Sequence, residues 1–130
     1  MHSIEFELNG KTKRLRYDVN AIADIEDTAG VGVFSLVSDQ KRIGYSSLRV
    51  LFWGGLKHED KGITLDRAGL ILKQLMDDGK TFDELYTLAI RALKISRVFP
   101  EAVADELEEA LNNLEENPTK PGKPGTKTTS

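Results

Sequence analysis

The chain has 130 residues, of which 39% are hydrophobic and 30% are charged, as expected for one globular domain. It contains no cysteine, which excludes disulfides, a thiolate nucleophile and Cys-ligated zinc or iron–sulfur centres. The 18 Lys and Arg residues against 21 Asp and Glu residues give a net charge of −3, which disfavours binding of nucleic acid by the chain as a whole. No apolar stretch approaches the roughly 18 residues of a membrane span, and residues 1–5 lack the features of a signal peptide, so we expect a cytoplasmic protein with no membrane contact.

A β-hairpin is expected at the start of the chain. Apolar residues alternate with glutamates over residues 4–8, and a second strand-like segment follows over residues 11–17. Asn9 and Gly10 between them favour a two-residue hairpin turn, because both tolerate a positive φ. The basic side chains of the second segment are interpreted as a solvated face or a protected edge, and not as an anion site.

Helical spacing of apolar residues begins at residue 19 and predicts a bundle of about five helices with the hairpin packed against it. The expected helices cover residues 19–29, 46–56, 64–77, 81–93 and 100–117, with a helical turn or two at residues 33–37. Residues 118–130 contain only Pro, Gly, Lys, Thr and Ser, so this segment is expected to be a disordered tail. The sequence therefore predicts a mainly α single domain over residues 1–117.

Cap residues support these helix boundaries. Thr81 and Glu84 have the spacing of a capping box, in which each side chain accepts a hydrogen bond from the other residue's amide. Gly30 is expected to end the first helix as a left-handed C-cap. Ser46 or Ser47 is expected to cap the helix that ends at residue 56.

Residues suited to catalysis or metal binding are scarce. Only His2 and His58 could supply an imidazole, and His2 lies at a terminus that is expected to fray. The charged run 58–60 is interpreted as a solvated loop, and residues 30–32 lack the further glycines and the Lys-Ser/Thr ending of a phosphate loop. We therefore expect no catalytic residue, no metal and no cofactor.

A helix-turn-helix interpretation of residues 64–94 is the alternative that involves nucleic acid. Asp83 and Glu84 would then stand at the start of the recognition helix, where they would repel phosphate. DNA binding is therefore disfavoured, and we expect no nucleic-acid partner.

Two helices have apolar surfaces that could bind protein. The helix over residues 46–56 carries Leu48 and Leu51 on one side, with Val50 and Trp53 roughly opposite. Such a helix is either wrapped by its own domain or uses Val50 and Trp53 to contact a client or a second subunit, and the sequence favours neither. In the second case Trp53→Ala removes binding and leaves the fold intact.

The last expected helix carries the beginning of a coiled-coil seam. Val103, Leu107, Ala110 and Leu114 are spaced 4-3-4, which is the pattern of a seam but covers only two heptads. Docking of this stripe onto the chain's own core is favoured over pairing with a second copy. Self-association through this seam or through the two-sided helix remains a hypothesis.

Two segments carry a resemblance to a known family: residues 15–26, LRYDVNAIADIE, and residues 48–58, LRVLFWGGLKH. Together with the hairpin before them, the small-residue turn at residues 29–30 and the Thr-led helix at residues 64–77, they resemble the tail assembly chaperones of long-tailed bacteriophages and related gene transfer agents. The resemblance covers about residues 4–97. It does not explain the acidic helix after Pro100 or the tail.

This resemblance implies a non-enzymatic helper of virion morphogenesis that acts in the host cytoplasm. Such a chaperone binds the tape measure protein, keeps its long apolar helices soluble and helps to recruit tail tube subunits. The partner-binding residues expected on this hypothesis are Val50, Trp53, Val103, Leu107 and Leu114. Another phage morphogenesis adaptor, or a small helix-turn-helix DNA-binding regulator, is the alternative.

Overall fold

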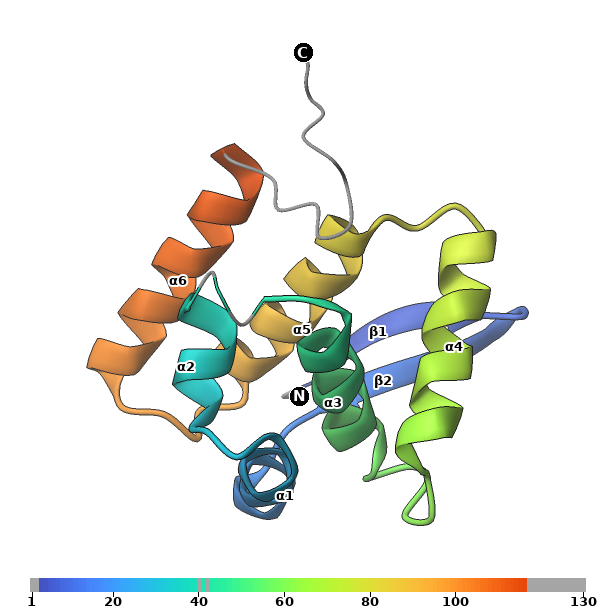
Figure 1. The fold of residues 1–130 in the computed structure, drawn as a ribbon, viewed down its shortest axis with the longest axis horizontal. Helices are drawn as coiled ribbons and strands as arrows, with labels where there is room; N and C mark the ends of the chain where they lie inside the picture. Colours follow the sequence, from blue (N-terminus) through green and yellow to red (C-terminus); the bar gives the residue numbers. More distant parts are fainter. Residues whose placement is uncertain (1–2, 40, 42, 117–130) are drawn as a thin grey trace.

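The computed structural model describes residues 3–39, 41 and 43–116. This part of the chain forms an antiparallel hairpin and six helices, so the predicted mainly α fold with an N-terminal hairpin is confirmed (Figure 1). In chain order the elements are β1 (Ser3–Leu8), β2 (Lys11–Arg16), α1 (Val19–Ala29), α2 (Val33–Ser38), α3 (Tyr45–Leu56), α4 (Leu65–Asp77), α5 (Phe82–Ile95) and α6 (Glu101–Glu116). None of the described helices has the length and apolar character needed to cross a bilayer. The predicted tail at residues 118–130 lies outside the described residues.

The hairpin turns at Asn9 and Gly10, which both have a positive φ (52° and 78°), as the Asn-Gly pair predicted. The register places Phe6 opposite Lys13. Because side chains alternate between the two faces of a strand, the apolar residues of both strands share one face, and Phe6 and Leu15 are buried there. The hairpin therefore presents one apolar face to the helices.

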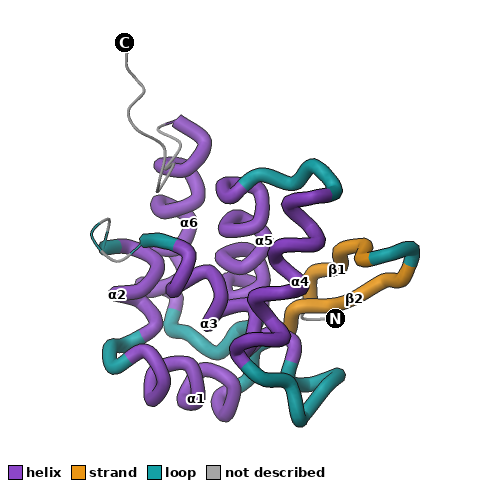
Figure 2. Tube along the Cα trace, turned by 45° about the vertical axis from the view of Figure 1, so that its right-hand side comes forward, coloured by secondary structure: helices purple, strands orange, loops and turns teal. Residues whose placement is uncertain are grey.

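The helices are arranged around α3. The hairpin lies at one side of the helices, as Figure 2 shows, and packs against α3, α4 and α5. α3 is central because it also contacts α1, α4 and α5. α6 packs against α5 and α2 on the side away from the hairpin (Figure 1).

Most cap residues act where the sequence predicted them. The Thr64 hydroxyl accepts a hydrogen bond from the Arg67 amide at the start of α4 (3.0 Å). Thr81 and Glu84 form the capping box of α5, with distances of 2.8 and 3.1 Å between each side-chain oxygen and the other residue's amide nitrogen. Gly30 ends α1 in the left-handed conformation, with a φ of 79°.

The predicted start of α3 was wrong. Neither Ser46 nor Ser47 is the N-cap, because α3 begins at Tyr45 and Gly44 precedes it in an extended conformation. The Ser47 hydroxyl, inside the first turn, instead accepts from the Gly44 amide (2.9 Å) and donates to the Gly44 carbonyl (2.8 Å). At the other end of the chain, α6 begins at Glu101, directly after Pro100. The Pro100 carbonyl oxygen accepts the first hydrogen bonds of this helix.

Two glycines let α3 approach its neighbours closely. A Cβ atom on Gly54 would overlap the Ile25 side chain of α1. A Cβ atom on Gly55 would lie 2.8 Å from Leu15 Cδ2 and 2.9 Å from the Tyr17 ring and hydroxyl. Real carbon atoms do not approach so closely in a well-packed interior, so only glycine fits at these two positions without movement.

Two buried tyrosines fix neighbouring parts of the fold to one another through backbone carbonyls. The Tyr17 hydroxyl donates to the Leu51 carbonyl of α3 (2.6 Å). The Tyr86 hydroxyl of α5 donates to the Leu36 carbonyl of α2 (2.9 Å) and lies 3.3 Å from the Ser47 hydroxyl. Burial raises the pKa of Tyr17, and it raises the pKa of Tyr86 to about 12.

Substitution of Gly55 by alanine is expected to destabilise the protein. The added methyl group meets the buried Leu15 side chain and the hydrogen-bonded Tyr17 ring, and overpacking of this kind costs about 1–3 kcal/mol. The free energy of unfolding in urea measures the effect. Gly69→Ala in α4 is the matched control, because a Cβ atom there meets only the flexible Arg49 side chain at 3.4 Å. A Gly55→Ala protein as stable as the Gly69→Ala protein would contradict the packing argument.

Stability is expected to fall in alkali as Tyr86 ionises in the unfolded chain. Its pKa rises from an ordinary value of about 10 to about 12 in the folded protein, so its contribution is complete below pH 10 and is lost as the pH rises through 12. The loss is about 2–3 kcal/mol and is measured by urea unfolding between pH 9 and 12, a window that follows from these two pKa values. Tyr86→Phe should reduce the slope of this pH dependence by about half, because the buried Tyr17, whose pKa is also raised, still contributes. Tyr45→Phe, at an exposed position, should keep the full slope. An unchanged slope in Tyr86→Phe would contradict the prediction.

Candidate functional site

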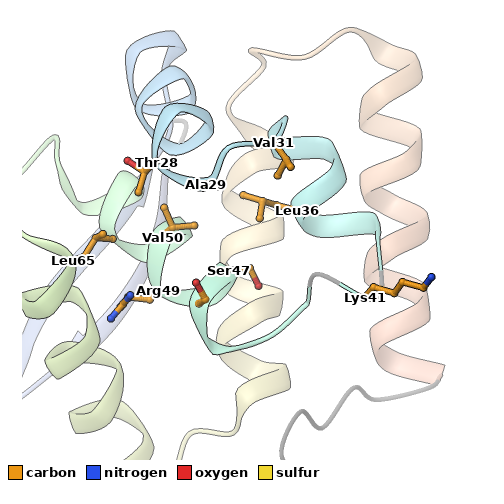
Figure 3. Close-up of a pocket in the computed structure, with 10 residues that line it drawn as sticks. Thr28, Ala29, Val31, Leu36, Lys41, Ser47, Arg49, Val50 and Leu65 are labelled. Carbon is orange, nitrogen blue, oxygen red and sulfur yellow. The ribbon is translucent and has the colours of Figure 1, made fainter.

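The surface around the N-terminal half of α3 contains two hollows. The first, which we name the α2 pocket, has a volume of about 410 Å³ and lies where α1, α2, α3 and α4 meet (Figure 3). It is lined by Thr28, Ala29, Val31, Leu36, Lys41, Ser46, Ser47, Arg49, Val50 and Leu65. In Figure 3 the apolar side chains of Val31, Leu36 and Val50 occupy its middle, and Arg49 extends from α3 toward α4.

The second hollow, which we name the α4 groove, lies between the start of α3 and one face of α4. Its volume is about 550 Å³, and it is lined by Tyr45, Ser46, Arg49, Gly69, Leu72, Lys73, Met76 and Asp77. The α4 residues of this lining recur at spacings of three and four, so they form one stripe along the helix, about 12 Å long at 1.5 Å per residue. The groove is therefore elongated and follows the axis of α4.

Apolar side chains form most of the wall of the α4 groove. The Tyr45 side chain is 54% exposed, and its ring packs edge-on against Phe82 with 5.2 Å between ring centroids. Leu72 is buried and Met76 is half-buried at the floor. An exposed aromatic ring beside a flexible methionine is typical of surfaces that bind protein.

The charged residues of the groove differ in how they are paired. Lys73 Nζ lies 2.8 Å from Asp77 Oδ2, and this hydrogen bond raises the pKa of Lys73. Arg49 has a buried Nε atom without a hydrogen-bond partner, and it forms no ion pair within the part of the chain that the structure describes. Arg49 is also one of two residues that line both hollows, the other being Ser46.

The two predicted contact residues of α3 are both largely covered by the chain's own elements. Val50 is 5% exposed and lines the α2 pocket. Trp53 is half-buried, its Nε1 donates to the Ile63 carbonyl (3.0 Å), and Lys57 Nζ lies 4.5 Å above its ring. Truncation of Trp53 would thus also remove contacts within the chain. The role of both residues in partner binding stays a prediction.

The predicted seam of α6 faces the chain's own core. Leu107 is 1% exposed and Val103 is half-buried, because α6 packs against α5 and α2. The Leu114 side chain lies outside the described residues. This arrangement matches the docking alternative, and pairing with a second copy through Leu107 would require α6 to leave α5.

His58 is the described imidazole, and its surroundings do not form a reactive cluster. The residue is half-buried at the end of α3, and burial is the largest cause that lowers its pKa. Its Nε2 atom is buried without a hydrogen-bond partner. Within residues 3–39, 41 and 43–116 no group of three or more His, Asp and Glu side chains is placed to hold a metal ion.

The structure adds an argument against a recognition helix at α5. Glu84 uses its carboxylate to cap the helix, so an acidic group is fixed at the end that would meet base edges. The acidic α6 packs along α5, and Lys94 of α5 pairs with Glu108 of α6. A phosphate backbone that approached this side of α5 would therefore meet negative charge.

Sequence reasoning missed Tyr45, Arg49 and Met76 as candidate binding residues. A signal existed for Arg49, because it is the charged residue within the apolar run of residues 48–53. The contact of Arg49 with Gly69, twenty positions away, has no local signature.

Comparison with known proteins identifies no relative: no family model, no curated protein and no solved structure matches the chain.

Substitution of Leu107 tests whether the α6 stripe serves the chain's own fold. Leu107→Ala should lower the free energy of unfolding by about 2–5 kcal/mol, because it empties a buried site between α6 and its neighbours. Urea unfolding measures this, and light scattering follows the mass. Glu106→Ala, at an exposed position of the same turn, should change neither quantity. A stable Leu107→Ala protein that loses a dimer present in the parent would instead favour the seam.

Proposed function

We propose that this protein is a non-enzymatic tail assembly chaperone of a long-tailed phage or gene transfer agent. In this role it binds the tape measure protein in the host cytoplasm and helps to recruit tail tube subunits. Another adaptor of phage morphogenesis is the second candidate. A DNA-binding regulator is the third, and the acidic surroundings of α5 weigh against it.

The observation that carries the protein-binding part of the proposal is the α4 groove. It combines an exposed Tyr45 ring with the Met76 side chain in an elongated hollow of about 550 Å³. A groove of this kind fits the apolar face of a helix, and a client of long apolar helices offers such faces. The assignment to tail assembly is supported by the resemblance of residues 4–97.

The neighbours of the gene distinguish the candidates at low cost. A position between a gene for a tail tube protein and a very long, helix-rich tape measure gene favours the chaperone. A position beside a promoter, among regulatory genes, would contradict the chaperone and favour the regulator.

Co-expression with tape measure fragments is the direct test. The full chain should raise the soluble yield of helical tape measure fragments. Tyr45→Ala should reduce this effect, because truncation of an aromatic residue that contacts the client weakens binding about tenfold or more. The fold should survive, because the substitution removes only an exposed ring and its edge contact with Phe82.

Val19→Ser is the matched control for that experiment. Val19 is an apolar residue that is 67% exposed at the start of α1, outside the lining of both hollows. It should leave the soluble yield unchanged. Fragments whose solubility does not respond to the parent chain would count against chaperoning, and equal effects of the two substitutions would count against the α4 groove as the client site.

A further inference from the structure

The α2 pocket and the α4 groove adjoin one another at Arg49. Arg49 and Ser46 line both hollows. A ligand that fills the α4 groove therefore reaches Arg49 at one end of the groove. The arginine stem crosses α4 at Gly69, where a Cβ atom would lie 3.4 Å from Arg49 Cδ. The stem therefore lies against α4 at Gly69.

Among the described residues of the α4 groove, Arg49 is the cation that has no carboxylate partner. Its Nε atom is buried and unpartnered, and no described residue pairs with it. The other charged groups of the groove, Lys73 and Asp77, form an exposed ion pair with each other. A half-buried arginine has lost part of its hydration, so an incoming carboxylate that accepts two hydrogen bonds from it gains more than it would at an exposed site.

The rest of the groove selects the shape of the ligand. The stripe on α4 from Gly69 to Asp77 is straight and about 12 Å long, and its apolar wall is made by Tyr45, Leu72 and Met76. A second helix presents apolar residues at the same three- and four-residue spacing, so its ridge fits such a groove. The volume of about 550 Å³ lies in the range of sites that enclose large apolar groups.

We propose that this surface binds an acidic amphipathic helix of a partner protein, with an Asp or Glu side chain of that helix on Arg49 and its apolar stripe in the α4 groove. Local charge complementarity identifies the occupant, because the unpaired Arg49 cation lies in an apolar groove and is complementary to a carboxylate beside an apolar stripe. The inference rests on the proposed function in one respect, namely that the α4 groove binds protein. It holds for a client of any origin.

Synthetic helical peptides provide the test without a tape measure protein. Each peptide of the first set carries leucine, phenylalanine or tryptophan at positions i, i+4 and i+7, and a glutamate beside this apolar stripe. The second set is identical except that glutamine replaces the glutamate. The glutamate peptides should bind the full chain about tenfold more tightly than the glutamine peptides, because a charged hydrogen-bonded pair is lost. Binding is measured by fluorescence anisotropy, and the site by amide NMR shifts at Tyr45, Gly69 and Met76.

The Arg49→Gln protein should bind both peptide sets equally, with the affinity that the parent has for the glutamine set. Arg67→Gln is the matched control: Arg67 is an exposed arginine of α4 outside both hollows, and its loss should keep the tenfold preference. Raising the salt from 50 to 500 mM gives a readout on the parent protein alone. It should weaken binding of the glutamate set and leave the glutamine set nearly unchanged.

Three results would overturn the inference. The first is equal binding of the two peptide sets by the parent chain, or binding of neither. The second is a preference for glutamate that survives Arg49→Gln. The third is displacement of the glutamate peptides by inorganic phosphate at the same concentration as the peptide. This result would make the surface a general anion site. Rescue of tape measure fragments without binding of glutamate peptides would leave the proposed function standing and defeat this inference alone.

Discussion

The close approach of α3 to α1 and β2 is the constraint on which the rest of the structure depends. Gly54 and Gly55 remove the side chains that would hold these elements apart, and the Tyr17 hydroxyl reaches the Leu51 carbonyl in the space that remains. The hydrogen bond lies in the interior, where an unsatisfied hydroxyl would be costly, so it fixes the position of β2 against the helix. The sheet has only two strands and gains its stability from this packing rather than from its own ladder.

The position of α3 also decides which apolar residues are left for a partner. Its C-terminal half is enclosed by α1, β2 and the loop that holds Trp53, so little of that half is accessible. Its N-terminal half begins at Tyr45, with the α2 pocket on one side and the α4 groove on the other. Most of the two-sided helix is wrapped by its own domain, which is one of the two alternatives that its sequence allowed, and its exposed large apolar residue is Tyr45 at the first turn. The other alternative, partner binding by Val50 and Trp53, stays a prediction.

Local signals in the sequence predicted the fold well, because each acts within a few residues. The Asn-Gly turn, the Thr81 capping box and the 3.6-residue period need no knowledge of distant contacts. The start of α3 was missed because the serines compete with the glycine before them, and the hydroxyl of Ser47 bonds backward from inside the helix. The candidate site was mostly not predictable, since its wall is built from the first turns of α3 and a stripe of α4 that lie twenty or more positions apart in the chain.

The separation of packing and binding along one rigid helix has a physical consequence for the site. Arg49 and Gly55 are about 9 Å apart along the axis of α3, and an α-helix transmits a tilt over that distance with little bending. The packing of α3 on α1 and β2 at Gly54 and Gly55 thus also helps to hold its first turns beside α4, where Tyr45 and Arg49 line the α4 groove. A substitution at Gly55 is therefore expected to affect stability and groove geometry together, whereas one at Arg49 removes a charge from the groove wall. A cleft with fixed walls loses less entropy on binding than a flexible one, so on the proposed function the buried glycines favour binding although they do not line the α4 groove.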